Sequence, residues 1–298
     1  MDVVVSGSHG FIGSALLPAL TAGGHRIRRL VRGPAGEGEV TWDPDAGTID
    51  SAGLDGVEGV VHLAGVGIGD KRWTAEQRAR IRDSRVRGTA VLAGALARLP
   101  TPPRVLVSGS AVGYYGDRGD EILSEESGPG DGFLAEVVRA WEDAAAPAAE
   151  AGIRVVFARS GVVQSPAGGA LRKQLPMFKL GLGGPLGSGR QWVSWITLDD
   201  EVGAILHALT TEALAGPVNL TAPEPVTGKT MAHALGQALH RPARLPVPKA
   251  ALGIAVGRQM ANEMVTASQR AVPARLLASG YRFSHPEVEA AMVALLGR

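Results

Sequence analysis

Three glycines near the start of the chain have a spacing that suits a phosphate-binding turn. Gly7, Gly10 and Gly13 form the pattern G-x-x-G-x-x-G, between the apolar run Val3–Val5 and a segment with one apolar face. The first glycine permits a tight turn, the second lets backbone N–H groups approach a pyrophosphate, and the third lets a helix pack closely on a sheet. The pattern therefore predicts a strand, a turn and a helix that bind a dinucleotide.

A basic residue follows the second predicted strand, His25–Val31. An NAD site carries Asp or Glu about 20 residues past the glycines, where it binds the ribose hydroxyls. Here Val31 is followed by Arg32. An acid would repel a 2′-phosphate, whereas an arginine can bind one. We therefore expect NADP rather than NAD, with Arg32 as the main contact and Arg29 as either a second contact or a solvated strand residue.

Hydroxyl groups cluster after the predicted strand Arg104–Val107. Ser108, Ser110 and Tyr114 follow it in a glycine-containing turn, at the carboxyl edge of a parallel sheet, where ligands bind in such folds. The strand Gly59–Gly65 ends in small residues, which leave room for a ribose and phosphates.

A stretch later in the chain, Gly168 and Gly169 followed by 177–189, is too glycine-rich for a core element and too apolar for a plain linker, and is typical of a binding loop or lid. Phe178, Trp192 and Trp195 would then either line a substrate pocket or pack in a second core.

The order of these elements predicts the fold. Strands alternate with helices throughout the first half of the chain, which indicates right-handed crossovers and an α/β Rossmann-type doubly wound parallel sheet. We expect residues 1–165 to form an NADP-binding domain to which 193–222 returns. Residues 166–192 and 223–298 are expected to form a small, mainly helical substrate domain.

Composition excludes several function classes. The net charge of +1 gives no field that would gather nucleic acid or a membrane surface, although Lys71–Arg87 is basic and is interpreted as a solvated helix face. The chain has no cysteine, which excludes thiolate catalysis and Cys-bound metals, and His233 and His240 have no third ligand nearby, so we expect no metal. With no basic leader and no long apolar run, the expected location is cytoplasmic.

Several blocks of the sequence together resemble the extended short-chain dehydrogenase/reductase superfamily. Within it, the chain looks like the NAD-dependent epimerase/dehydratase-like subfamily that includes bacterial YfcH-type proteins, and the resemblance covers nearly the whole chain. The blocks that carry it are Gly7–Gly13, Val60–Gly65, Val86–Thr89, Ser108–Ser110 before Tyr114, Arg159–Val163, Gly181–Gly189, Trp195–Asp200 and Ala278–Phe283.

The resemblance implies an NADP(H) site and a role for each matching residue. Arg85 stands where many extended members have Asn, so we expect it to contact cofactor or substrate. The resemblance places the pyrophosphate at Ser6, Gly7, Gly10, Phe11, Ile12 and Gly13, the 2′-phosphate at Arg32, the ribose side at Leu63 and Ala64, and the nicotinamide end at Ser108 and Ser160. The neighbouring Val31 and Gly65 are expected to contact the cofactor as well.

The chain departs from the superfamily at its catalytic helix. The family uses Tyr-x-x-x-Lys one helix after the serine turn, where the lysine lowers the pKa of the tyrosine so that the phenol exchanges a proton with the substrate. The corresponding helix here, 132–146, has neither residue: Phe133 or Leu134 takes the tyrosine register, and Val137 or Val138 the lysine register. This makes the chain an atypical member.

Two functions follow from this departure. The first is an NADP-dependent oxidoreductase or epimerase-like enzyme on an unknown carbonyl or sugar-type substrate. Ser110 matches the family's active-site serine, and Tyr114 or a residue of the substrate domain would act as the acid, because a serine needs an activating partner. The alternative is a non-catalytic NADP(H)-sensing regulatory module. Analogy with the superfamily also suggests a homodimer through helices at 88–99 and 133–146.

Overall fold

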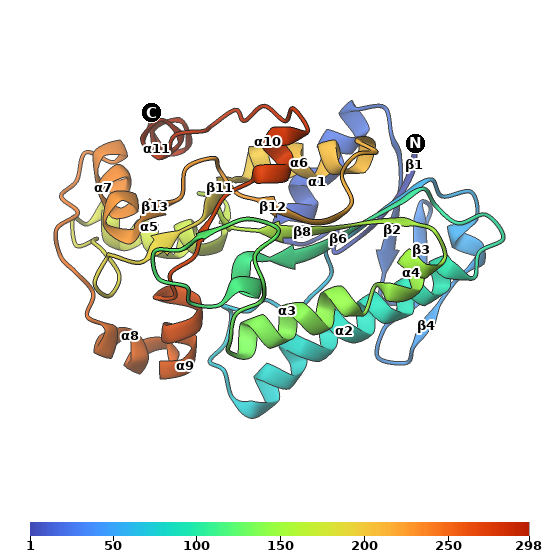
Figure 1. Cartoon of the computed structure of the whole chain (residues 1–298), viewed down its shortest axis with the longest axis horizontal. Helices are drawn as coiled ribbons and strands as arrows, with labels where there is room; N and C mark the ends of the chain where they lie inside the picture. Colours follow the sequence, from blue (N-terminus) through green and yellow to red (C-terminus); the bar gives the residue numbers. More distant parts are fainter. Residues whose placement is uncertain (298) are drawn as a thin grey trace.

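A sheet of eight strands forms the centre of the computed structural model, which describes residues 1–297 (Figure 1). The strand order is β12-β8-β6-β5-β1-β2-β3-β4, and every neighbouring pair is parallel except β3 with β4. The predicted doubly wound parallel sheet is thereby confirmed. Its strands are β1 Asp2–Ser6, β2 Arg26–Val31, β3 Glu39–Asp43, β4 Thr48–Ile49, β5 Gly59–His62, β6 Val105–Ala111, β8 Arg154–Ser160 and β12 Gly216–Leu220.

Helices cover both faces of this sheet, which explains why its central strands are continuous apolar runs. The side chains of Val3–Val5 are fully buried, and β1 lies between β2 and β5. Helices α1 (Phe11–Ala22) and α6 (Leu198–Thr210) lie on one face. Helices α2 (Ala75–Ala97), α3 (Phe133–Asp143) and α4 (Ala146–Glu150) lie on the other (Figure 1).

Three predicted boundaries differ from the structure. Strand β6 continues through the serines to Ala111, and a short helical turn, η2 (Val112–Tyr115), follows it. The segment expected as one helix over 132–146 is divided into α3 and α4. The stretch expected as a lid begins with a helix, α5 (Gly169–Lys179), which packs through Leu171, Leu175 and Phe178.

A second, mainly helical core lies beyond the carboxyl edge of β8 and β12. Trp195 and Phe178 are buried in it together with residues of α7 (Gly228–Ala238) and α11 (Val288–Leu296). These two aromatic residues pack a core and do not line a pocket. Trp192 is half-buried, and its indole N–H donates to Asp120 at 2.8 Å.

The remaining elements are short. Parallel β9 with β11 continues from the end of β8. No helix within residues 1–297 is long and apolar enough to cross a membrane. The short elements are η1 Ala52–Leu54, β7 Ile122–Leu123, β9 Val162–Ser165, β10 Trp192–Val193, β11 Trp195–Thr197, β13 Val226–Thr227, α8 Lys249–Val256, α9 Arg258–Met260, η3 Ala261–Val265, β14 Arg270–Ala271 and α10 Ala274–Ala278.

Candidate functional site

The glycine turn joins β1 to α1, and its geometry demands glycine at two positions. Gly7 has φ +69°, and a Cβ there would lie 2.7 Å from the carbonyl carbon of Leu63. A Cβ at Gly13 would collide with the carbonyl oxygen of Gly7. The turn therefore lies directly against the end of β5, with α1 packed closely on the turn. This is the geometry that a pyrophosphate-binding turn requires.

Ser6 lies beneath the turn and is fully buried. Its Oγ accepts hydrogen bonds from the backbone N–H groups of Leu63 (3.2 Å) and Ala64 (3.3 Å), and lies 2.6 Å from Nδ1 of His62. Because this oxygen accepts two N–H groups, its own hydrogen goes to Nδ1, and His62 carries its proton on Nε2, 3.1 Å from Oγ1 of Thr89. Burial lowers the pKa of His62 to about 4, so the ring is neutral. Ser6 thus holds the end of β5 in place.

The ring of Phe11, at the first position of α1, lies against the backbone of Gly168 and Gly169. A Cβ at Gly168 would collide with this ring, and one at Gly169 would lie 3.1 Å from it. Phe11 therefore packs on the backbone that enters α5, while Ile12 packs against the core beneath the sheet face. The start of α5 consequently lies over the glycine turn.

The arginines of β2 and the following residue differ in their partners. Arg28 pairs with Asp2 at 2.6 Å and Arg29 with Glu39 at 2.7 Å. Arg32 is exposed next to half-buried Val31 and takes part in no ion pair among residues 1–297. Of these arginines, Arg32 is the one left available for an external anion.

Arg85 extends from α2 toward the loop that follows β5. Its guanidinium donates to the carbonyl oxygens of Val66 (2.9 Å) and Ile81 (3.1 Å), and lies 5.0 Å from the ring centre of Trp141. Burial lowers its pKa to about 10, so it remains charged at neutral pH. No carboxylate within residues 1–297 pairs with it. A cation in this position attracts a negative group from outside the chain.

Ser110, Glu142 and Arg159 form a buried polar cluster at the carboxyl ends of β6 and β8. The carboxylate of Glu142 accepts hydrogen bonds from Nε and a terminal nitrogen of Arg159, each at 2.8 Å. It also accepts a hydrogen bond from Ser110 Oγ at 2.6 Å. Burial lowers the pKa of Arg159, but the hydrogen bonds and the charge of Glu142 outweigh burial and raise it overall. Both side chains of this ion pair are therefore charged, and each neutralises the other.

Two adjacent tyrosines contact this cluster in different ways. The guanidinium of Arg159 lies 3.5 Å from the ring centre of Tyr114, which is half-buried. Tyr115 is fully buried, and its hydroxyl accepts from Arg159 at 3.1 Å and donates to Asn219 at 2.8 Å. Burial raises the pKa of Tyr115. Tyr114 is thus the phenol that a ligand can reach.

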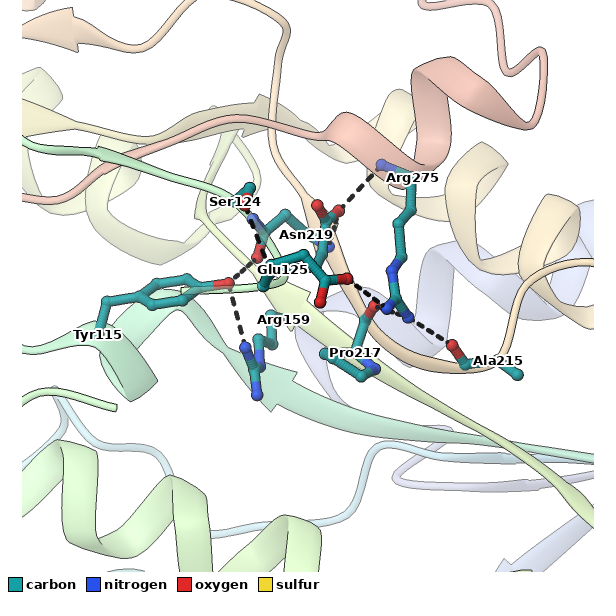
Figure 2. A network of polar contacts seen from close by, with 9 residues as sticks. Tyr115, Ser124, Glu125, Arg159, Ala215, Pro217, Asn219 and Arg275 are labelled. Atoms are coloured by element: carbon teal, nitrogen blue, oxygen red, sulfur yellow. Dashed lines mark hydrogen bonds and ion pairs between the residues drawn. The ribbon is translucent and has the colours of Figure 1, made fainter. Parts of the chain in front are cut away.

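Figure 2 shows how Asn219 carries this network toward the C-terminal part of the chain. Its backbone N–H donates to Glu125 Oε1 at 3.0 Å, and the backbone N–H of Arg275 donates to the same oxygen at 3.3 Å. Arg275 also donates to the carbonyl oxygens of Ala215 and Pro217. The loop that contains Glu125 is therefore fastened to β12 and α10.

The other predicted serines have partners within the protein. Ser108 is fully buried in β6. Ser160, half-buried at the end of β8, donates to Oε1 of Glu201 at 2.5 Å. Burial raises the pKa of Glu201 to about 8, so this carboxyl is uncharged at neutral pH. The structure thus brings Ser110 and Tyr114 together around Arg159, whereas Ser6 and Ser108 lie beneath the surface.

The charged residues of this site were not predicted from the sequence. Glu142 lies in the last turn of the helix that lacks the tyrosine and lysine, and Arg159 lies in the block Arg159–Val163 that carries part of the family resemblance. A signal was available, because an arginine that closes a strand buried on both faces needs a carboxylate partner. Which of the acids would supply it could not be read from their spacing.

Comparisons with known proteins agree with this geometry. The family model described as NAD dependent epimerase/dehydratase family matches residues 3–220. The chain belongs to this family. A second model, a domain of unknown function called DUF1731, matches residues 247–295 of this epimerase/dehydratase family member. The predicted resemblance to the epimerase/dehydratase-like group is confirmed.

Individual relatives are similar over the full length. Epimerase family protein Mb2239 of Mycobacterium bovis is 45% identical over 97% of this chain and 96% of its own. The crystal structure of human epimerase family protein SDR39U1 with NADPH has a TM-score of 0.91 and 38% identity, over 99% of each chain. A nucleoside-diphosphate sugar epimerase from Corynebacterium glutamicum has a TM-score of 0.81 and 39% identity, over 100% of this chain and 58% of that one.

Proposed function

We propose that this chain is an NADP(H)-dependent oxidoreductase or epimerase-like enzyme that acts on a carbonyl or sugar-type substrate. The observation that carries the proposal is the cluster of Ser110, Tyr114, Glu142 and Arg159 at the carboxyl edge of the sheet that also holds the glycine turn. The NADPH in the human relative's structure and the name of the C. glutamicum relative support the cofactor and the substrate class.

The cofactor would lie along the glycine turn. Backbone N–H groups from Gly7 to Gly13 would bind its pyrophosphate, with Phe11 and Ile12 holding the start of α1. Leu63, Ala64 and Gly65 would border the ribose, and Arg32 beside Val31 would bind the 2′-phosphate. Ser6 and Ser108 would support this surface from below, and Ser160 would lie at the nicotinamide end. When bound, the nicotinamide supplies or accepts a hydride.

Tyr114 would exchange the proton with the substrate oxygen. Ser110 gives its hydroxyl hydrogen to Glu142, so its oxygen can accept a hydrogen bond from a substrate hydroxyl but cannot donate. Arg159 beside the ring would stabilise negative charge left on the phenol oxygen. Arg85, which lacks a carboxylate partner within residues 1–297, would bind a negative group of cofactor or substrate.

Oxidation of NADPH in the presence of a carbonyl panel tests this proposal. The panel should include nucleotide sugars with a keto group, free keto sugars and simple ketones, and the control omits the carbonyl. We expect carbonyl-dependent loss of NADPH with one class. Stoichiometric NADPH binding without turnover across the whole panel would contradict the oxidoreductase, and unchanged nucleotide sugars after incubation with the chain and NADP⁺ would contradict the epimerase-like enzyme.

That negative result would favour a second candidate, a non-catalytic NADP(H)-sensing module. Its motivating observation lies in α3, which has neither tyrosine nor lysine, and whose Leu134 and Val138 lie within 4 Å of where a Cβ on Gly113 would be, beside the serine turn. A sensor predicts different Kd values for NADPH and NADP⁺, together with a conformational change that only one of them produces. Equal Kd values would exclude it.

Two expectations about the whole protein stay predictions. The homodimer through α2 and α3 is checked by sedimentation of the purified chain at several concentrations. The cytoplasmic location is checked by fractionation of the native cells.

A further inference from the structure

Helix α8 (Lys249–Val256) is apolar and yet lies on the surface. Its sequence is Lys-Ala-Ala-Leu-Gly-Ile-Ala-Val, none of its residues is buried, and Ile254 is 78% exposed. Exposed apolar residues are normal singly, but a whole apolar helix without a buried residue indicates a surface that something covers. The helix lies in the part of the chain that the DUF1731 model matches.

Two hollows border α8 and the residues that follow it. One, of about 270 Å³, lies between α8 and η3 and is lined by Ala250, Ile254 and Ala261 among others. The second, of about 290 Å³, lies between α9 and the residues just before α2, and is lined by Trp73, Val256 and Met260 among others. Arg258 lines both hollows, so they are adjacent, and we refer to the two together as the groove.

The charged residues of this groove all have the same sign. Lys249 and Arg258 line the first hollow and Arg72 the second, and no acidic residue lines either within residues 1–297. Arg72 is held in place because its guanidinium donates to the carbonyl oxygen of Ile254 at 2.7 Å. The groove therefore combines apolar walls with unneutralised cations.

We propose that this groove binds an anionic amphiphile, a small molecule that joins a carboxylate to an apolar chain. The cations attract the carboxylate, and the apolar lining of α8 and Trp73 covers the chain. None of the lining residues belongs to the cofactor site proposed above, so this binding does not depend on catalysis.

The groove is also connected to the residues near the cofactor edge. Trp73 donates its indole N–H to Ile68 at 2.8 Å and packs edge-on against Phe133, the first residue of α3, with ring centres 5.2 Å apart. Glu263 of η3 accepts the backbone N–H of Leu134 at 2.9 Å. A ligand in the groove would therefore contact the elements that lead to Arg85 and Glu142.

Titration calorimetry of the full chain with sodium decanoate tests the proposal. We expect saturable binding at one site, and binding of hexanoate weaker by about fourfold for each methylene that no longer reaches the groove. Acetate and decyltrimethylammonium should not bind. Equal binding of decyltrimethylammonium would overturn the charge argument, and no saturable binding of decanoate would overturn the proposal.

Variants assign the site. Arg258→Glu and Lys249→Glu should each weaken decanoate binding by about tenfold, which corresponds to the loss of one charge contact. Arg244→Glu is the matched control, because Arg244 is exposed and precedes Lys249 by five positions but does not line the groove. NADPH titration of each variant checks the fold. The same weakening in Arg244→Glu would contradict the proposal, because it would show a general effect of charge. A dimer of the wild type that Ile254→Asp dissociates would also contradict it, because the exposed face of α8 would then bind a second copy of the chain.

Discussion

Glu142 on α3 accepts two hydrogen bonds from Arg159 on β8, one from Nε and one from a terminal nitrogen, each at 2.8 Å. The two side chains form a bidentate ion pair that is almost completely shielded from solvent. This pair lies where the helix that has lost the family's tyrosine and lysine meets the edge of the sheet. It gives the site a cation that contacts Tyr114 on one side, and a carboxylate that fixes Ser110 on the other.

Removal of one partner should therefore destabilise the fold. Glu142→Ala leaves a buried guanidinium without its carboxylate, and we expect the free energy of unfolding to fall by about 3–5 kcal/mol. Ser110→Ala removes a single hydrogen bond and should cost about 1 kcal/mol. Urea denaturation measures both. Equal losses in the two variants would show that the ion pair does not hold these elements together.

Charge reversal at Arg32 should change the choice of cofactor. Arg32→Glu should weaken NADPH binding by about tenfold or more and leave NADH binding nearly unchanged, because only NADPH carries the 2′-phosphate. Arg26→Glu is the matched control, since Arg26 begins the same strand and its side chain is 79% exposed. Fluorescence titration measures the Kd of each variant for both cofactors. Equal weakening of NADPH and NADH binding in Arg32→Glu would refute the role of Arg32.

The glycine turn should not tolerate the smallest side chain. Gly13→Ala directs a methyl group at the carbonyl oxygen of Gly7, and the overlap should cost about 1–3 kcal/mol and weaken cofactor binding. Gly128→Ala should be neutral, because a Cβ at Gly128 has no atom within 4 Å. Thermal unfolding with and without NADPH compares them. An unchanged Tm for Gly13→Ala would mean that the turn can widen.

The buried carboxyl of Glu201 should give stability a measurable pH dependence. Its pKa in the folded chain, about 8, lies above the ordinary value, 4.5, so between these values the folded state binds more protons than the unfolded state. The free energy of unfolding therefore falls as pH rises through this window, by up to about 1.4 kcal/mol per pH unit.

Glu201→Gln isolates this contribution. The amide oxygen can still accept from Ser160, but the side chain no longer titrates. His62 contributes in the opposite sense below pH 6.5, and its contribution cancels between variant and wild type. We expect the free energy of unfolding of the Gln variant to rise steadily relative to that of the wild type from pH 5 toward 8, as measured by denaturation at each pH. A constant difference between the two proteins over this range would show that Glu201 is ionised at neutral pH.

The sequence was sufficient for the fold and for the glycine turn, for a physical reason. Val3–Val5 are β-branched and apolar, which favours a buried strand, and the glycine spacing fits a turn in which Gly7 and Gly13 meet backbone atoms. These are local constraints, which leave local patterns. The alternation of apolar strands with helices indicated the remaining strands of the sheet, and the residues after 222 indicated the helices of the smaller domain.

The charged part of the site could not be predicted because its contacts are long-range. Glu142 meets Arg159 across 17 positions, Ser160 meets Glu201 across 41, and Tyr115 meets Asn219 across 104. No periodicity connects such pairs. The aromatic residues Phe178 and Trp195 illustrate the same limit, because aromatic side chains occur both in pocket walls and in cores. Only the packing of α5, α7 and α11 around them shows that they lie in a core.

The most direct test of the central claim is turnover of NADPH with the carbonyl that the panel identifies, measured in wild type and Tyr114→Phe together with the Kd for NADPH. The phenylalanine keeps the ring against Arg159 and removes only the hydroxyl. We expect turnover in the variant to be reduced by at least about a hundredfold, as for loss of a general acid, with an unchanged Kd. Turnover equal to that of the wild type would remove Tyr114 from the mechanism and contradict the account.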